Sequence, residues 1–359
     1  MYCAFYPGKE WLDTKGEPIQ AHGGMILNQN GVYYWIGENK ELTDGINGIW
    51  TYGVRCYRSK DLYNWEDCGL IIKPDLEDIA SPLNPYMVYL DRPHIIYNEM
   101  TNKYICWLKI MHKNGIQSLT VLTADDILGP YKIVKTGLRP SNMSTGDFDL
   151  VVDKDKKAYC YFEKVHSEIV CIELNDEYTD VTEVYSSHFR HQSPPDVREG
   201  IAHFDRNNRF YLVSSGTTGY LPNPSQLSVS NNRHGPFRVL GDPHLDDDSH
   251  TSFHSQISCV FKVEGKKDLF IAMADRWLPD RTDLKYEDYE DCFRIHFSKD
   301  PSLEQLDYLR QKAKTIPFST HIDTSKATYI WLPFEFDENR GYLKWRDRWS
   351  LDEFDSLDT

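Results

Sequence analysis

A block of short strands recurs along the chain, and this repeat limits the possible folds more than any other feature. It begins with the aromatic run 32–36 (Val-Tyr-Tyr-Trp-Ile), continues through 54–59 and ends at 60–65 (Lys-Asp-Leu-Tyr-Asn-Trp). The same order returns twice with a Gly-Pro-aromatic ending, at 103–108, 119–125 and 129–131, and at 209–214, 226–230 and 235–237. Weaker copies pair 158–162 with 169–174 and 269–274 with 293–298.

About five copies of a four-stranded unit predict an all-β fold, a five-bladed β-propeller whose blades stack around a channel. A two-sheet sandwich also has many short strands, but the turn after the third strand recurs at blade-like spacing, which favours the propeller. No linker-like segment divides the chain, so residues 1–359 are expected to form one domain. The last segment, from 329 through Trp349, is expected to close the ring or to pack beneath it.

The amino-acid composition indicates which classes of ligand the chain could bind. The 23 Tyr, 16 Phe and 9 Trp suit strands and also suit sugar stacking. A formal net charge of −15 argues against a nucleic-acid partner, and a mean hydropathy of −0.57 without a long apolar run argues against a membrane span. Residues 1–7 show no export signal, so a cytoplasmic protein is expected unless a leader was removed ahead of them.

Polar residues just before the predicted inner strands are the candidates for chemistry, because ligands of a propeller meet the channel mouth where these strands begin. Four places qualify, namely His22 in Ala-His-Gly-Gly, Asp91 in Asp-Arg-Pro-His, Glu199 in Val-Arg-Glu-Gly and Gln256 in His-Ser-Gln. Glu199 precedes the apolar run 201–204, so its carboxyl is expected to face the channel. A carboxyl in a partly apolar pocket has a raised pKa and can protonate a leaving oxygen, as in glycoside cleavage. A surface ion pair with Arg198 is the alternative.

The other three candidates have more open roles. Asp91 could activate water about 6.5–9.5 Å from the acid of an inverting glycosidase, could orient the sugar, or could pair with Arg92. Gln256 could hold a water through its amide or only complete backbone hydrogen bonds. His22 could bind a sugar hydroxyl or line the channel, because the adjacent glycines let backbone approach a ligand, but a structural histidine is also consistent with the sequence.

Other chemistries gain no support from the sequence. It contains no P-loop, Rossmann glycine pattern, Gly-x-Ser-x-Gly or His-Glu-x-x-His. Neither a cofactor nor a metal site is predicted. A structural calcium ion could bind the aspartate run 246–248, but the spacing of a cation loop is missing, which favours a solvated loop. The eight cysteines lack metal-binding spacing and are expected to be free thiols.

The chain resembles glycoside hydrolase family 43, and within it the exo-β-1,3-galactanase-like subfamily. The matching segments follow the family order over nearly the whole chain and are 11–13, 21–24, 33–38, 59–65, 91–93, 198–199, 215–223, 255–256, 275–277 and 331–333. The resemblance implies a five-bladed propeller and an inverting mechanism with Glu199 as the acid. This subfamily has His-Gly-Gly where most relatives carry the base aspartate, and a glutamine, here Gln256, is proposed to hold the attacking water. Its second-blade acidic residue corresponds to Asp91.

The resemblance also implies contacts with the sugar. These are expected from Glu38, Asp147, Thr218 and Trp277. Two departures from the family pattern, Arg-Glu-Gly-Ile at 198–201 and Trp-Leu-Lys at 107–109, bear on galactan specificity.

The predicted function is removal of a terminal galactose from a β-1,3-galactan-type plant polysaccharide or its oligosaccharides by an inverting, exo-acting glycoside hydrolase. An α-L-arabinofuranosidase or β-xylosidase of the same family is the first alternative, since one scaffold hosts these activities. A non-catalytic sugar-binding propeller is the second, because an amide is a poor base. The expected partner is the oligosaccharide or polysaccharide alone, and the sequence does not constrain the oligomeric state.

Overall fold

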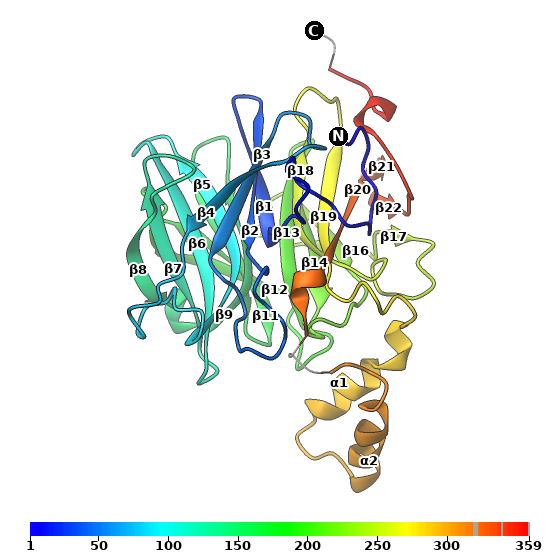
Figure 1. Cartoon of the computed structure of the whole chain (residues 1–359). Coiled ribbons are helices and arrows are strands. Elements are labelled where there is room, and N and C mark those ends of the chain that lie inside the picture. The colour runs from blue at the N-terminus through cyan, green and yellow to red at the C-terminus, as the bar shows by residue number, and fades with distance from the viewer. Residues whose placement is uncertain (319–321, 339, 358–359) are drawn as a thin grey trace.

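The strands of the computed structural model, which describes residues 1–318, 322–338 and 340–357, form a propeller of antiparallel sheets (Figure 1). Four sheets have four strands in chain order. They comprise β1 (His22–Gln29), β2 (Val32–Glu38), β3 (Val54–Ser59) and β4 (Glu66–Ile72); β5 (Val88–Asn98), β6 (Lys103–His112), β7 (Gln117–Ala124) and β8 (Lys132–Leu138); β9 (Thr145–Val152), β10 (Ala158–Lys164), β11 (Glu168–Leu174) and β12 (Val181–His188); and β13 (Arg198–Arg206), β14 (Arg209–Gly216), β15 (Gln226–Ser230) and β16 (Arg238–Gly241).

A fifth sheet has three strands, β18 (Gln256–Lys262), β19 (Phe270–Arg276) and β20 (Thr328–Pro333). The first strands of these five sheets contact one another in the order β1, β5, β9, β13 and β18, and β18 contacts β1. This closed ring confirms the predicted all-β propeller.

The predicted number of five blades is corrected by the structure, in which the described residues form six sheets. The sixth contains β17 (His244–Leu245), β22 (Arg340–Lys344) and β21 (Glu335–Asp337), and β17 pairs with β22 in parallel. Its strands have only two to five residues and come from distant parts of the chain. Such short strands carry no periodic signal, so the repeat analysis did not find them.

Neighbouring blades share hydrophobic clusters, which bury the faces that one blade cannot bury alone. Between the first and fifth sheets this cluster includes Trp35, Trp65 and Trp331, each at most 1% exposed. The chain ends meet at the same place, where Phe5 stacks on Trp349 with ring centroids 4.2 Å apart. The Phe5 amide also donates a 2.8 Å hydrogen bond to the Trp349 carbonyl, so the two terminal segments are joined beside the first blade.

Each of the five inner strands contains an irregular register near its start. The shifts occur between His22 and Met25, between Asp91 and His94, and between Glu199 and Ala202, with equivalent shifts in β9 and β18. Bulges of this kind turn a side chain out of the pleat and often flank active sites. The same irregularity is therefore repeated around the channel mouth. It occurs at or next to the four positions that the sequence singled out.

Two helices lie between β19 and β20, where the sequence predicted a strand at 293–298. They are α1 (Glu290–His296) and α2 (Leu303–Lys312), and they project from the end of the molecule away from the chain termini (Figure 1). The strand prediction was wrong because the spacing of Phe293 and Phe297 is helical, with acidic residues in the first turn of α1 and basic residues in the last. Within the described residues, neither helix is long and apolar enough to cross a membrane.

Candidate active site

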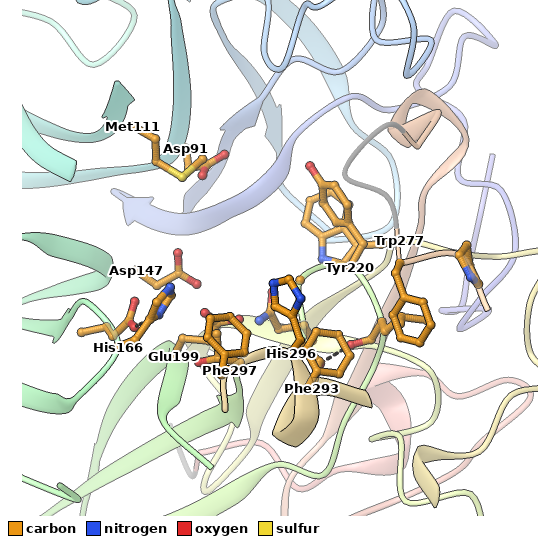
Figure 2. Close-up of a pocket in the computed structure, with 18 of the residues that line it drawn as sticks. Asp91, Met111, Asp147, His166, Glu199, Tyr220, Trp277, Phe293, His296 and Phe297 are labelled. Carbon is orange, nitrogen blue, oxygen red and sulfur yellow. Dashed lines mark hydrogen bonds and ion pairs between the residues drawn. The ribbon is translucent and has the colours of Figure 1, made fainter. Parts of the chain in front are cut away.

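A cavity of about 540 Å³ opens at the channel mouth, between the inner strands and the two helices. Most of the residues expected to bind or cleave a sugar line it. These are Glu38, Asp91, Asp147, Glu199, Thr218, Gln256 and Trp277. Figure 2 shows Asp91, Asp147 and Glu199 near one another on the strand side and Phe293, His296 and Phe297 on the side of α1.

Glu199 occupies the bulge of β13 and is followed by Gly200 with φ +58°. Its neighbour Arg198 does not pair with it, because that guanidinium donates to Ser214 Oγ and to the carbonyls of Ser214 and Pro224. Burial raises the pKa of Glu199 well above its usual range, and the negative charges of Asp147 and Glu163 raise it further. A carboxyl in this state keeps its proton and can act as a general acid.

Asp147 lies at the centre of a buried ionic network. Its carboxylate accepts hydrogen bonds from Arg92 Nη2 at 2.8 Å, Lys109 Nζ at 2.9 Å and the Gly200 amide at 3.1 Å. Burial alone would raise the pKa of Asp147, but the charges of Arg92 and Lys109 hold it below its usual range. Asp147 therefore stays ionised, and its negative charge helps Glu199 to stay protonated.

Asp91 is held by partners other than Arg92, which was one of the alternatives that the sequence left open. Trp50 Nε1 donates to Asp91 Oδ1, and Lys109 Nζ lies 3.4 Å from Asp91 Oδ2. Lys109 thus joins Asp91 to Asp147. The cost of burying Lys109 would lower its pKa, but the two aspartates raise the pKa above its usual range, so it stays a cation. In this part of the cavity, one lysine compensates two carboxylates.

Gln256 is fixed in orientation by both ends of its amide. Its Nε2 donates to Ser215 Oγ at 2.8 Å, and its Oε1 accepts from Arg92 Nη2 at 3.3 Å. An amide nitrogen has a second hydrogen and an amide oxygen a second lone pair, so each keeps one site for a water or a sugar hydroxyl. This geometry makes Gln256 suitable for positioning a small polar molecule.

Replacing Gly200 with alanine is expected to destabilise the fold and to displace Gln256. A Cβ at position 200 would lie 2.6 Å from Ser215 Oγ and 2.9 Å from Gln256 Nε2, and the φ of +58° would add about 1–2 kcal/mol of strain. Gly137→Ala is the matched control, because Gly137 has φ +64° and open space around it. Chemical denaturation should show a larger loss of stability for Gly200→Ala. Equal losses would contradict the close approach.

Glu38 is a second carboxyl with a raised pKa. Burial raises the pKa of Glu38 to about 7, with Asp91 adding to the shift and Lys40 opposing it. Its Oε2 lies 2.6 Å from Lys40 Nζ, and its Oε1 accepts from the Arg92 amide at 3.0 Å. The ammonium of Lys40 is also 5.1 Å from the ring centroid of Trp50 and 5.9 Å from that of Trp277. The predicted pair Glu38 and Trp277 therefore lies on one side of the cavity.

His22 is the predicted site residue that the structure places elsewhere. It is 0% exposed and does not line the cavity. Its Nδ1 lies 3.0 Å from Asp275 Oδ1, and its Nε2 lies 3.2 Å from both Gln20 Oε1 and the Tyr329 hydroxyl. Burial lowers the pKa of His22, although Asp275 opposes the shift. With both ring nitrogens engaged inside the protein, His22 supports the first inner strand and does not reach a sugar in this structure.

Thr218 lines the cavity within the segment 215–223, where it also stabilises the loop. Its Oγ1 donates to the Leu221 carbonyl and accepts from Asn223 Nδ2. The next aromatic side chain, Tyr220, stacks on Trp50 with centroids 5.3 Å apart and lies 5.2 Å from Trp277. These three rings form an aromatic side of the cavity that is suited to contact with a sugar face.

Several residues of the cavity were not predicted from the sequence. They are Trp50, Arg92, Lys109, Glu163, His166 and Tyr220, together with residues from the two helices. Lys109 had a signal, because it departs from the family pattern, and Tyr220 lies in a matching segment. No sequence signal indicated Glu163, because this residue lies on the second strand of its blade and reaches the site only across the bulge of β9. Gly146 in that bulge leaves room for it, since a Cβ at position 146 would lie 1.8 Å from Glu163 Oε2.

The structure contains no group of three or more His, Cys, Asp or Glu arranged to hold a metal, within the residues it describes. The aspartate run at 246–248 is partly used for local structure. Asp247 accepts hydrogen bonds from the amides of Thr251 and Phe253.

Comparison with known proteins identifies similar sequences and structures. The family model described as Glycosyl hydrolases family 43 matches residues 20–258. No curated protein is matched significantly by sequence. Among solved structures, a family 43 β-1,3-galactosidase has 29% identity and a TM-score of 0.77 over 98% of this chain, and the chain spans only 64% of that protein's length.

Two further solved structures are similar to this chain in fold. A second family 43 β-1,3-galactosidase, solved with galactodeoxynojirimycin, has 25% identity and a TM-score of 0.76, with 97% of this chain and 100% of that chain covered. An exo-β-1,3-galactanase from Phanerochaete chrysosporium, solved with galactose, has 22% identity and a TM-score of 0.75, with 97% and 68% covered. The last of these likenesses bears on the fold alone.

Proposed function

The chain belongs to glycosyl hydrolase family 43 and is a glycoside hydrolase, and from this premise we propose that it is an inverting, exo-acting enzyme that removes terminal galactose from β-1,3-galactan-type chains or their oligosaccharides. The observation that carries this proposal is the half-buried carboxyl of Glu199, which has a raised pKa and lies in a cavity that also holds ionised Asp147. The choice of galactose is supported by the β-1,3-galactosidases at 25–29% identity.

In the proposed reaction, Glu199 gives its proton to the glycosidic oxygen while the bond from that oxygen to the anomeric carbon breaks. A water molecule attacks the anomeric carbon from the opposite face, as inversion requires. Gln256 positions this water through the free sites of its amide, and Asp91, which lies 3.4 Å from Lys109 Nζ, accepts the proton that the water loses. Glu38, Thr218 and Trp277 contact the sugar. The cycle ends when the protons on the two carboxyl groups re-equilibrate with solvent.

The anomeric form of the product tests the proposal. With the methyl β-glycoside of β-1,3-galactobiose as substrate, only the cleaved terminal sugar appears as free galactose, and proton NMR at early times should show it as the α-anomer, followed by slow mutarotation. Free β-galactose as the first product would contradict inversion. Release of sugar only from aryl α-L-arabinofuranosides or β-xylosides would replace galactose with a pentose. Sugar binding without any turnover would favour a non-catalytic propeller.

A further inference from the structure

The two helices supply a wall of the cavity that differs in chemistry from the strand side. We name the helical wall as the cavity-lining residues Phe293, His296, Phe297, Leu309, Pro317 and Phe318. Five of these six side chains are apolar. The strand side instead presents carboxylates, cations and the amide of Gln256. The cavity is therefore polar at one end and largely apolar at the other.

The helical wall is anchored to the propeller. The hydroxyl of Tyr289 donates to the Pro222 carbonyl, and the Tyr286 amide donates to the Ser249 carbonyl at 2.9 Å. Arg294 forms an ion pair with Asp196, which lies just ahead of β13. A hydrophobic cluster that includes Leu221, Tyr289 and Ile316 packs against Phe293 and Phe318 of the wall. These contacts hold the wall in a fixed position relative to Glu199.

Phe297 connects the helical wall to the surroundings of Glu199. It is 39% exposed, a large value for an aromatic side chain next to a cavity, and its ring centroid lies 5.9 Å from that of His166. His166 Nδ1 in turn lies 3.0 Å from Glu163 Oε1, and Glu163 is one of the charges acting on Glu199. Asp91, in contrast, is held by Trp50 and Lys109. The helical wall is thus connected to Glu199 through His166 and Glu163, away from the contacts that hold Asp91.

This position corresponds to the leaving group. A general acid contacts the glycosidic oxygen, so the terminal sugar lies on one side of it and the leaving group on the other. The carboxylates and Gln256 suit the hydroxyls of the sugar. The rings of the helical wall could contact a sugar face, but His296 is the one polar side chain among its six residues, so the hydroxyls of a second sugar would find few partners there. An apolar aromatic group would gain more from leaving water.

We propose that the helical wall is a binding site for an aromatic, apolar group on the leaving-group side, so that the enzyme prefers galactosides and galactan oligosaccharides that carry such a group to unsubstituted ones. This inference rests on the proposed function for the identity of the sugar and narrows what the sugar is attached to. The wall acts on the affinity for the leaving group and not on proton transfer.

The test compares two variants on three substrates. Phe297→Ala removes the exposed ring of the wall, and Tyr308→Ala, the control, removes a 38% exposed ring from α2 that does not line the cavity. The substrates are 4-nitrophenyl β-galactoside, methyl β-galactoside and β-1,3-galactobiose, each compared with the wild type so that leaving-group reactivity cancels. Phe297→Ala should lower kcat/KM for the nitrophenyl substrate about tenfold more than for the methyl substrate. Tyr308→Ala should leave this ratio unchanged.

Equal losses on all three substrates would overturn the proposal, and so would a larger loss on galactobiose, which would mean that a second sugar stacks on Phe297. If the wild type cleaves only pentosides, the proposed galactose specificity fails, and the same ratio is measured with aryl and methyl pentosides. If it cleaves none, calorimetry with phenyl and methyl 1-thio-β-galactosides gives the comparison. A phenyl preference that Phe297→Ala leaves unchanged would then overturn the proposal.

Discussion

Glu199→Gln is expected to lower kcat on β-1,3-galactobiose by at least about a hundredfold, the lower range for loss of a general acid. The amide has nearly the shape of the carboxyl but cannot protonate the glycosidic oxygen. In a galactoside of a highly acidic phenol, such as 2,4-dinitrophenol, the phenolate leaves without being protonated. The decrease in kcat on this substrate should therefore be much smaller. Steady-state kinetics with both substrates measures the difference. An equal loss on both would assign Glu199 a role other than proton donation.

The pH dependence of the melting temperature of Glu199→Gln tests independently whether the pKa of Glu199 is raised. The folded-state pKa of Glu199 is raised above its unfolded value of about 4.3. A raised pKa contributes stability that is present below pH 4.3 and is lost as the pH rises through the folded pKa. Glutamine does not titrate, so the melting temperature of the variant relative to the wild type should increase between pH 4.5 and pH 8. A constant difference would mean that the pKa of Glu199 is not raised.

The repeat was enough to predict the propeller because each copy encodes a blade that cannot be stable alone. Three strong copies correspond to the first, second and fourth sheets, and the weak copy at 158–174 corresponds to β10 and β11. The copy at 293–298 failed because two phenylalanines four residues apart fit a helix as well as a strand. The sixth sheet escaped because β17 pairs with β22 across almost a hundred residues, and two-residue strands have no period.

The positions of the site residues were easier to predict than their partners. Asp91, Glu199 and Gln256 could be placed at the cavity because each lies near the start of an inner strand, and a propeller brings those starts together. His22 met the same criterion, yet its ring is fully enclosed by Gln20, Asp275 and Tyr329. Sequence alone cannot show which way a side chain turns at a bulge. The link from Lys109 to both Asp91 and Asp147 depends on three strands from two blades and has no sequence signature.

Lys109→Met is expected to lower the free energy of unfolding at pH 7 by about 3–5 kcal/mol, because it leaves buried Asp147 and half-buried Asp91 without their shared cation. The charge of Lys109 also lowers the pKa of Glu199, so its loss should raise that pKa and move the alkaline limb of the pH–rate profile upward. Lys109→Arg keeps the charge and is the matched control. Its pH–rate profile should stay close to that of the wild type.

The pH dependence of stability separates this ionic effect from a packing defect. The folded-state pKa of Asp147 is depressed, so its contribution to stability is present above the unfolded pKa of about 3.9 and is lost as the pH falls through the folded pKa. Without Lys109 that contribution shrinks, and the stability gap between wild type and Lys109→Met should be widest above about pH 5 and should decrease as the pH falls below about 3.9 towards the folded pKa. A gap that is the same at about pH 7 and about pH 2.5 would show that methionine merely packs badly. A gap that closes would show that Lys109 helps to keep Asp147 ionised, and it is the charge of Asp147 that helps Glu199 to hold its proton.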